Sequence, residues 1–227
     1  MLRHYRDVTA HAPDALTVVA GLGHSPDGAA KLGMLAACHC GPLDVAEHET
    51  KSLTTFGQPV MNAFGPLDYT QLNTMFDGDY PRGALNYWKS SFLSALTDEA
   101  IDTMVDGYAR CPSPTSGLFL EHVHGAATRV AVSETACPHR IPGYNLLVMG
   151  QWSQPADTVR CVQWARDTYE AMQPFMAGTR YVNYLNDDEG DDPAAAAYGP
   201  NYPRLRAIKS KYDPMNVFHL NQNIPPA

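Results

Sequence analysis

The segment "GYNLLVMGQWSQPADTVRCVQWARDTYEAMQPF", residues 143–175, decides the fold. Its first ten residues are almost wholly apolar, which is typical of a central strand buried on both faces. The remainder predicts a helix that carries apolar residues along one side, at Val162, Ala165, Tyr169 and Met172. A buried strand followed by an amphipathic helix indicates a sheet with a helical cover.

Outward from this segment, the patterning predicts strands and helices in mixed order. Further strands are predicted over residues 15–23, 31–40, 84–93, 116–130 and 180–186. Further helices are predicted over residues 2–13, 42–57, 97–112 and 201–214. The order lacks the regular βαβ alternation of a parallel sheet. The predicted fold class is therefore α+β, a mainly antiparallel β-sheet with helices packed on one face.

Two of the predicted helices carry clear start signals. Thr97 precedes an acidic first turn and is expected to cap the 97–112 helix. Asn201 is the candidate cap of the last helix, which ends before Pro214. The inward side of that last helix is predicted at Leu205, Ile208 and Tyr212.

Composition excludes several kinds of partner. The 227 residues carry a formal charge of -8, so no nucleic-acid partner is expected. No apolar run approaches the roughly 20 residues that cross a bilayer, and residues 1–13 lack the apolar core of a secretory signal. We therefore expect a cytoplasmic location without membrane association. The five cysteines are odd in number and form no CxxC pair, which favours reduced thiols.

Three short clusters contain residue types that bind metals. His122 and His124 would share one face of a strand, as would Cys38 and Cys40. A zinc site needs about four ligands in tight geometry, and no spacing brings these pairs together. The acidic run at 187–192 lacks the alternate-ligand pattern of a calcium loop and is interpreted as a solvated loop. No metal site is predicted.

The stretch "RYVNYLN", residues 180–186, places two tyrosines around an asparagine in a short β-type run. In a strand, Tyr181 and Asn183 would point to one face and Tyr184 to the other. A phenol and a carboxamide on one face need hydrogen-bond partners if they are buried. Core packing with wet phenol tips and a ligand-facing strand both fit this pattern.

The C-terminal sequence resembles a known family signature. Five elements occur in family order: Tyr181 to Tyr184, Tyr198 to Asn201, Arg204-Leu205, Lys211 to Phe218, and Asn223 to Pro226. This signature resembles that of berberine bridge enzyme-like FAD-linked oxidoreductases, of the vanillyl-alcohol oxidase superfamily. Upstream, "YWKSSFL" and "ETACPHRIPGYNLLVMGQW" also resemble the substrate-binding domain of that family. The resemblance implies two parts, a substrate-binding α+β domain at 1–178 and a C-terminal segment at 179–227.

The resemblance also implies a missing part. Family members carry an FAD-binding domain of comparable size in front of this region, and that domain holds the covalent flavin attachment. No residue here matches such an attachment site, so the N-terminal FAD domain is expected to be absent. FAD is then the cofactor of the complete enzyme and is not expected to bind to this chain alone. The expected partners are a small-molecule substrate, a separate FAD-binding domain and a second copy in a homodimer.

Site residues follow from the resemblance where the motif matches. Tyr181 matches a substrate-facing tyrosine and is the candidate catalytic residue, whereas Asn183 matches an asparagine near the flavin. Asn145 and Leu147 fall at substrate-facing strand positions, although an apolar Leu147 removes a catalytic base there. Tyr181 would need a cationic neighbour to act as a base, because a phenol has a pKa near 10. Tyr184 would pack behind the sheet.

Two functions remain open from the sequence. The first is the substrate-binding and C-terminal portion of an FAD-dependent oxidoreductase, which oxidises a C–H next to oxygen or nitrogen by hydride transfer to flavin. The second is a free-standing, non-catalytic α+β module that self-associates or binds a small molecule without flavin. By itself, the chain is expected to be inactive.

Overall fold

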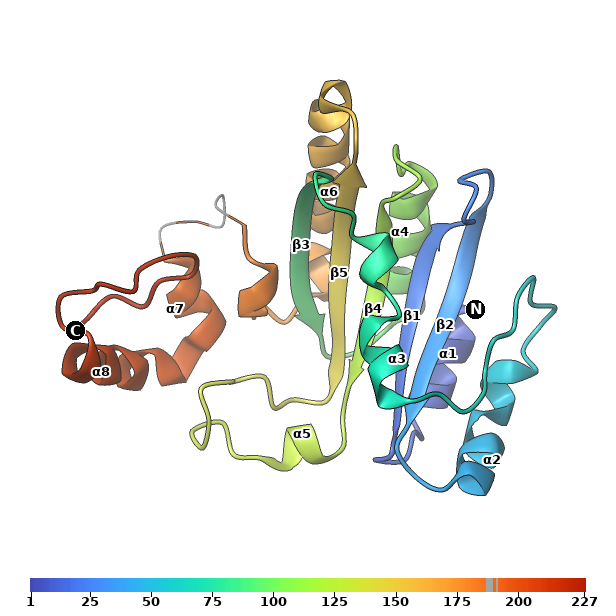
Figure 1. Ribbon diagram of the computed structural model, residues 1–227, viewed down its shortest axis with the longest axis horizontal. Helices are drawn as coiled ribbons and strands as arrows, with labels where there is room; N and C mark the ends of the chain where they lie inside the picture. The colour runs from blue at the N-terminus through green and yellow to red at the C-terminus, as the bar shows by residue number, and fades with distance from the viewer. Residues whose placement is uncertain (187–189, 191) are drawn as a thin grey trace.

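The computed structural model describes residues 1–186, 190 and 192–227 (Figure 1). The strands are β1 (Leu16–His24), β2 (Lys31–His39), β3 (Leu85–Leu93), β4 (Gly117–Val123) and β5 (Gly143–Trp152). The helices of the N-terminal and central parts are α1 (Leu2–Thr9), α2 (Leu43–Thr54), α3 (Tyr69–Thr74), η1 (Asp77–Asp79), α4 (Asp98–Ala109), α5 (Ala126–Arg129), η2 (Pro155–Asp157), α6 (Thr158–Met172) and η3 (Gln173–Phe175). Those nearer the C-terminus are η4 (Val182–Tyr184), α7 (Pro193–Tyr198), η5 (Gly199–Asn201) and α8 (Tyr202–Tyr212). Of the predicted acidic loop, residues 187–189 and 191 lie outside the described residues.

Across the described residues the strands form one five-stranded sheet in the order β2-β1-β4-β5-β3. All neighbouring strands run antiparallel, so the predicted α+β class is confirmed. Strand β5 pairs on both sides, as its apolar sequence predicted. It can begin close to β3 because residue 143 is glycine: a Cβ there would lie 2.3 Å from the carbonyl oxygen of Leu93.

One face of the sheet packs against α1, α4 and α6. Tyr144, Leu146 and Val148 of β5 join the hydrophobic core on this side, together with Met104 of α4 and Trp164 of α6. Burying such side chains contributes roughly 1.5–3 kcal/mol each. The predicted cap is also present, since the side chain of Thr97 accepts from the backbone N–H of Ala100. Helical cover is therefore concentrated on one side, which we call the helix face.

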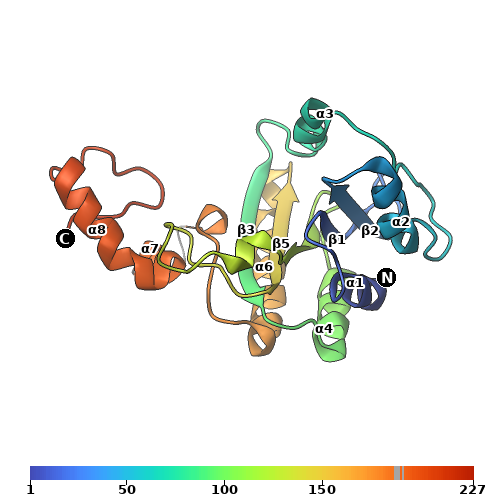
Figure 2. The ribbon, with the colours of Figure 1, turned by 90° about the horizontal axis from the view of Figure 1, so that it is seen from below.

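Among the described residues, the opposite side of the sheet, which we call the open face, carries no comparable helical layer. The segment of residues 57–84, with α3, crosses in front of it (Figure 1). Figure 2 shows α3 on the opposite side of the sheet from α1 and α4. Helix α3 buries no residue, so it covers the open face only loosely.

Residues 193–227, which we call the C-terminal arm, extend to one side of the sheet (Figures 1 and 2). Asn201 anchors the arm by donating from Nδ2 to the carbonyl oxygens of Val132, Thr135 and Ala136. Asn201 occupies the N-cap position of α8, as predicted, but its side chain makes no cap hydrogen bond. Ile208 and Tyr212 were predicted to face inward but are 45% and 74% exposed.

The prediction of a strand at 180–186 is wrong. The chain just before this segment pairs with the backbone of β3 at the end of that strand. There the N–H of Phe92 donates to the carbonyl oxygen of Thr179, and the carbonyl oxygen of Phe92 accepts from the N–H of Ala177. The chain then turns into η4, in which the N–H of Tyr184 bonds to the carbonyl oxygen of Tyr181. Because the segment turns, strand alternation does not apply, and Tyr184 lies on the open face rather than behind the sheet.

Candidate functional site

Strand register places both predicted substrate-facing residues on the open face. Asn145 and Leu147 alternate with the core residues of β5 and therefore point away from the helices. Asn145 pairs with Phe92 on one side and with Glu121 on the other. Both residues are nevertheless buried, so the open face is covered by other side chains and not bare to solvent.

Glu121 is the residue that sequence reasoning missed. Its carboxylate accepts from Asn145 Nδ2 at 2.8 Å through Oε2 and from the Tyr184 hydroxyl at 2.9 Å through Oε1. One half-buried carboxylate thus joins β4, β5 and η4. A signal was present in the sequence, because an acid in the apolar run of 117–123 is expensive to bury without a partner.

The hydrogen bond to Glu121 determines the chemistry of Tyr184. Burial raises the pKa of this phenol, and the nearby negative charge of Glu121 raises it further. Tyr184 is therefore held as a hydrogen-bond donor at neutral pH and does not act as a base. Its ring packs edge-on against Trp88 and Tyr181.

Tyr181, the candidate catalytic residue, lies beside Tyr184. Its hydroxyl oxygen accepts from Asn183 Nδ2 at 2.9 Å, so the two motif residues are in direct contact. The imidazole of His139 packs edge-on against its ring, at 6.3 Å between centroids. Burial lowers the pKa of His139, so this neighbour is a neutral ring at pH 7 and does not supply the positive charge that a tyrosine base needs.

Aromatic rings form a continuous cluster along this side. The rings in contact are, in order, Tyr80, Trp88, Tyr184, Tyr181, His139 and Phe92. A hollow of about 280 Å³ opens beside the cluster, lined by Asn86, Trp88, Asn183, Tyr184, Leu185 and Asn186. Amide groups and flat rings together suit a ligand with both polar and aromatic surface.

Buried polar atoms without hydrogen-bond partners also gather on the open face. They are Trp88 Nε1, Ser90 Oγ, Asn145 Oδ1 and Gln151 Nε2. The register of β3 and β5 places all four residues on the same side as Leu147. Because most buried polar groups are paired in native proteins, such a group of orphans indicates a surface that receives polar atoms from another molecule.

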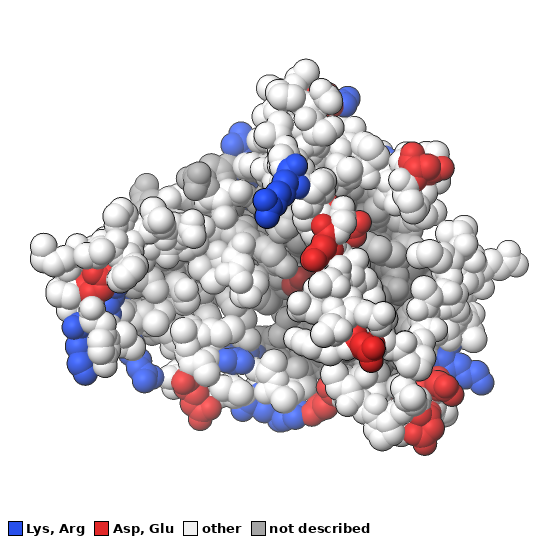
Figure 3. All heavy atoms as spheres, viewed as in Figure 1, with Lys and Arg blue, Asp and Glu red and all other residues white. Residues whose placement is uncertain are grey.

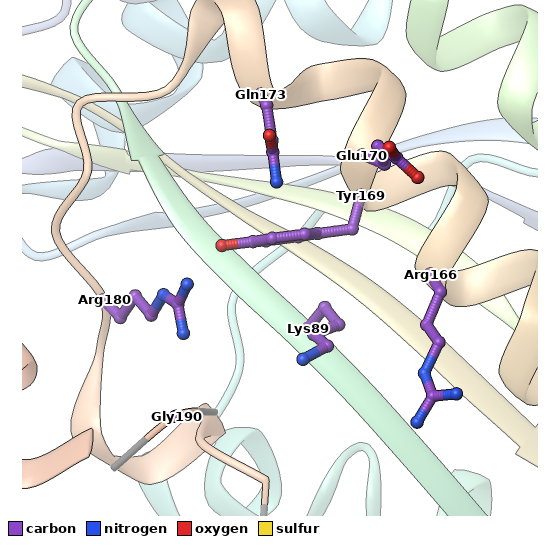
Figure 4. A pocket seen from close by; sticks show the side chains of 7 residues that line it. All are labelled: Lys89, Arg166, Tyr169, Glu170, Gln173, Arg180 and Gly190. Atoms are coloured by element: carbon purple, nitrogen blue, oxygen red, sulfur yellow. The ribbon is translucent and has the colours of Figure 1, made fainter. Parts of the chain in front are cut away.

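A second hollow, of about 420 Å³, lies on the helix face next to β3 (Figure 4). Lys89, Arg166 and Arg180 line it around the ring of Tyr169. Lys89 Nζ lies 5.7 Å from the centre of that ring and 5.6 Å from that of Tyr87. A cation near an aromatic face is attracted by the ring, so each holds the other in position. Contacts within the protein therefore explain the arrangement of side chains around this hollow.

The histidine and cysteine clusters do not form a metal site in the part of the chain that the structure describes. His122 and His124 stack on each other with ring centroids 4.2 Å apart. The five cysteines are free. Within the described ranges, no helix combines the length and apolarity needed to cross a membrane.

Comparison with known proteins gives consistent results. A model of the berberine and berberine-like family matches residues 180–225. An FAD-linked oxidoreductase of Dictyostelium discoideum is 27% identical over 78% of this chain and 38% of its own length. An uncharacterized FAD-linked oxidoreductase of Bacillus subtilis is 32% identical over 78% of this chain and 40% of its own. The chain therefore spans about two fifths of the length of these relatives.

Solved structures share the fold. Physcomitrella patens BBE-like 1 superposes with a TM-score of 0.79 at 20% identity, covering 100% of this chain and 50% of its own. The 6-hydroxy-D-nicotine oxidase of Arthrobacter nicotinovorans gives 0.79 at 22%, again covering 100% and 50%. The fold is thus the antiparallel α+β unit found in such proteins. Over most of its length the chain is similar to berberine bridge enzyme-like FAD-linked oxidoreductases, and residues 180–225 match the family model itself.

Proposed function

We propose that the chain is the substrate-binding and C-terminal portion of an FAD-dependent oxidoreductase that oxidises a C–H bond next to oxygen or nitrogen. The observation that carries this proposal is the group of buried polar atoms without partners on the open face. The similarity to known proteins supports it, because the curated relatives are FAD-linked. The division into a substrate-binding domain at 1–178 and a C-terminal segment at 179–227 is part of the same proposal.

The residues on the open face fit one side of a flavin ring. An isoalloxazine needs hydrogen-bond donors along its polar edge and flat surfaces against its face. Trp88 Nε1 and Gln151 Nε2 are donors without partners, and the rings of Trp88 and Tyr184 are flat surfaces. Asn183, the candidate cofactor-binding residue, lines the adjoining hollow. When bound, the flavin would supply the hydride acceptor.

The work of this chain is to bind and orient substrate. Leu147 and the aromatic rings would contact its apolar part, and Asn145 would bind its polar part. Tyr181 is the candidate catalytic residue, and its hydroxyl oxygen accepts a hydrogen bond from Asn183. Its proposed role is to accept a proton from a substrate hydroxyl or amine as the C–H bond breaks, with the cationic neighbour that a tyrosine base needs supplied by the substrate or the FAD-binding unit.

The test requires both parts of the catalytic machinery. The chain is expressed joined to an FAD-binding unit of the family, and flavin bleaching is followed anaerobically with a panel of alcohols and amines. We expect Tyr181→Phe to slow bleaching by roughly 10²–10⁴-fold, as for loss of a general base. Tyr212→Phe, on the exposed surface of α8, is the matched control and should have no effect.

Two outcomes would reject the oxidoreductase proposal: no bleaching with any donor, or full activity of Tyr181→Phe. Retained small-molecule binding without bleaching would favour the alternative, a non-catalytic module. That alternative has one supporting observation, the exposed apolar residues of the C-terminal arm, Met215, Val217, Phe218 and Leu220.

The same exposed residues favour association with a partner. Apolar patches of more than a few hundred Å² are usually covered in soluble proteins. The proposed partners are an FAD-binding domain or, in its absence, a second copy of the chain in a homodimer. Light scattering at micromolar concentration should report a dimer, and replacing Val217 and Phe218 with serine should shift it toward monomer. A monomer before any substitution would reject the homodimer.

A further inference from the structure

The strands sort their charges between the two faces of the sheet. They contain two lysines, Lys31 and Lys89, and one acid, Glu121. Lys31 reaches α4, where Nζ donates to the carbonyl oxygens of Tyr108 and Ala109, and Lys89 lies beside the α6 residue Tyr169. Both strand cations therefore point to the helix face, whereas the one strand carboxylate points to the open face.

The hydrogen-bond partners of Glu121 leave its negative charge in place. In Figure 3, which looks at the molecule as in Figure 1, acidic atoms lie both near the middle of this view and at its margins, and a basic side chain stands above the middle. The neighbours that hold the carboxylate, Asn145 and Tyr184, are neutral donors. They fix its position without neutralising its charge, and each carboxylate oxygen keeps a further lone pair.

Glu121 also fixes which atom of Asn145 meets a ligand. Because Nδ2 is donated to the carboxylate, Oδ1 must point elsewhere, and this buried oxygen has no hydrogen-bond partner. Asn145 thus presents an acceptor. A group bound here must donate hydrogen bonds, as a hydroxyl or an ammonium does and a carboxylate does not.

The aromatic cluster decides between these two donors. Trp88 and Tyr184 are in ring contact, Tyr184 bonds directly to Glu121, and both rings line the hollow on this side. A cation near an aromatic face is attracted by the ring, and a nearby carboxylate attracts it as a full charge. A neutral hydroxyl lacks the attraction to the ring and gains only a hydrogen bond from the carboxylate.

We propose that Glu121, Asn145 and the Trp88–Tyr184 pair form a binding site for the protonated amine of an aromatic ligand. The inference deepens the proposed function, on which its catalytic meaning rests, because a ligand bound here as substrate would be an amine rather than a sugar or an acid. Glu121 is the residue that selects the charge, and Asn145 accepts a hydrogen bond from the ammonium.

Three matched probes test the site on the chain as it is, without flavin. Benzylamine, benzyl alcohol and benzoate share one ring and differ in the charge and hydrogen bonding of the attached group. Binding at neutral pH is followed through the indole N–H signal of Trp88 in ¹⁵N NMR spectra, assigned with Trp88→Phe. We expect benzylamine to bind at least tenfold more tightly than benzoate, with benzyl alcohol between them.

Substitution locates the source of the preference. Glu121→Gln keeps the size of the side chain and an acceptor for Tyr184, and it should reduce benzylamine binding about tenfold while leaving benzyl alcohol within a factor of two. Glu170→Gln removes one negative charge beside the hollow on the helix face and should change neither. If Glu121→Gln fails to fold, the ranking of the three probes on the unsubstituted chain still tests the site.

Equal binding of benzylamine and benzoate would overturn the proposal, as would unchanged benzylamine binding by Glu121→Gln or no response of Trp88 to any probe. Failure here is distinct from failure of the proposed function, because flavin reduction is measured separately on the joined protein. If benzylamine binds most tightly but no flavin bleaching is seen, the amine site is supported and the oxidoreductase proposal is rejected. If flavin bleaching is seen but benzylamine is not preferred, the oxidoreductase proposal is supported and the amine site is rejected.

Discussion

The two faces of strand β5, which are formed by alternate residues, bury different kinds of side chain. Toward the helices, Tyr144, Leu146 and Val148 are packed into the core. Toward the open face, Asn145 and Gln151 carry buried polar atoms that lack hydrogen-bond partners. The first arrangement stabilises the fold, whereas the second costs stability and makes sense where another molecule supplies the missing hydrogen bonds. Burial alone does not distinguish them, since both sets of side chains are buried.

The largest expected difference between the faces comes from two adjacent leucines. Leu146→Ala removes a side chain that is 0% exposed beneath the helices and should lower the free energy of unfolding by about 3–5 kcal/mol. Leu147 pairs with Ser90 on one side and with Phe119 on the other. Leu147→Ala should lower the free energy of unfolding by about 2 kcal/mol, because side chains on the open face can relax more easily into the space. Urea unfolding measures both, and equal losses would break the distinction.

A second difference concerns acid. Burial lowers the pKa of His122, which faces Tyr144 on the helix face, to about 4, with the neighbouring His124 as a smaller cause. In the unfolded chain its pKa is near 6.5. As pH falls from about 6.5 toward 4, the unfolded state binds the proton first, so stability is present above this window and is lost within it. After discounting for partial exposure, we expect a loss of about 1–2 kcal/mol between about pH 7 and pH 5.

Urea unfolding at these two pH values checks the expected loss. In His122→Phe, which keeps a ring in the stack, the pH dependence should shrink by that amount. In His48→Gln, on the exposed side of α2, it should not change. An unchanged pH dependence in His122→Phe would show that this imidazole is solvated rather than held neutral.

Much of the fold was predictable because local and global preferences agree. Apolar runs bounded by turn residues predicted the five strands of the sheet, although the strand predicted at 116–130 ends at Val123 and is followed by α5. Apolar spacing predicted the long helices, and the Thr97 cap of α4 is present. The last helix shows where this reasoning stops: Ile208 and Tyr212 have inward spacing but are exposed. An amphipathic pattern shows that a helix has an apolar side, and it does not say which surface, if any, covers that side.

The candidate site was predictable only in part. Asn145 and Leu147, which the resemblance placed at substrate-facing positions, lie on the open face, whereas the predicted face of Tyr184 is wrong because residues 182–184 form η4 and not a strand. Glu121 was missed because its role depends on two partners distant in sequence, at 24 and 63 residues. No local pattern encodes such contacts. The roles of Tyr181 and Asn183 stay predictions.

Two neighbouring serines of β3 compare the two faces of the sheet through a smaller change in stability. Ser90 lies on the open face with its hydroxyl buried and without a partner. Ser91 points the other way and donates to the carbonyl oxygen of Thr179. Ser91→Ala should lower the free energy of unfolding by about 0.5–1.5 kcal/mol, whereas Ser90→Ala should leave it unchanged or raise it slightly. Urea unfolding of the pair checks this, and a loss in Ser90→Ala would mean that its hydroxyl is satisfied in solution.

The smallest expected effect is the response of the isolated chain to FAD. On the open face, Trp88 Nε1, Gln151 Nε2 and Asn183 offer two or three contacts to a flavin ring, and each net hydrogen bond contributes about 0.5–1.5 kcal/mol. Association costs an estimated 4–15 kcal/mol, so the affinity should be millimolar or weaker. Titration followed by FAD fluorescence should show no saturation at micromolar chain, and Asn183→Ala should behave like the unsubstituted protein. Micromolar binding that Asn183→Ala abolishes would mean that the open face holds a flavin by itself, and its unpaired polar atoms would then be cofactor contacts already sufficient for binding.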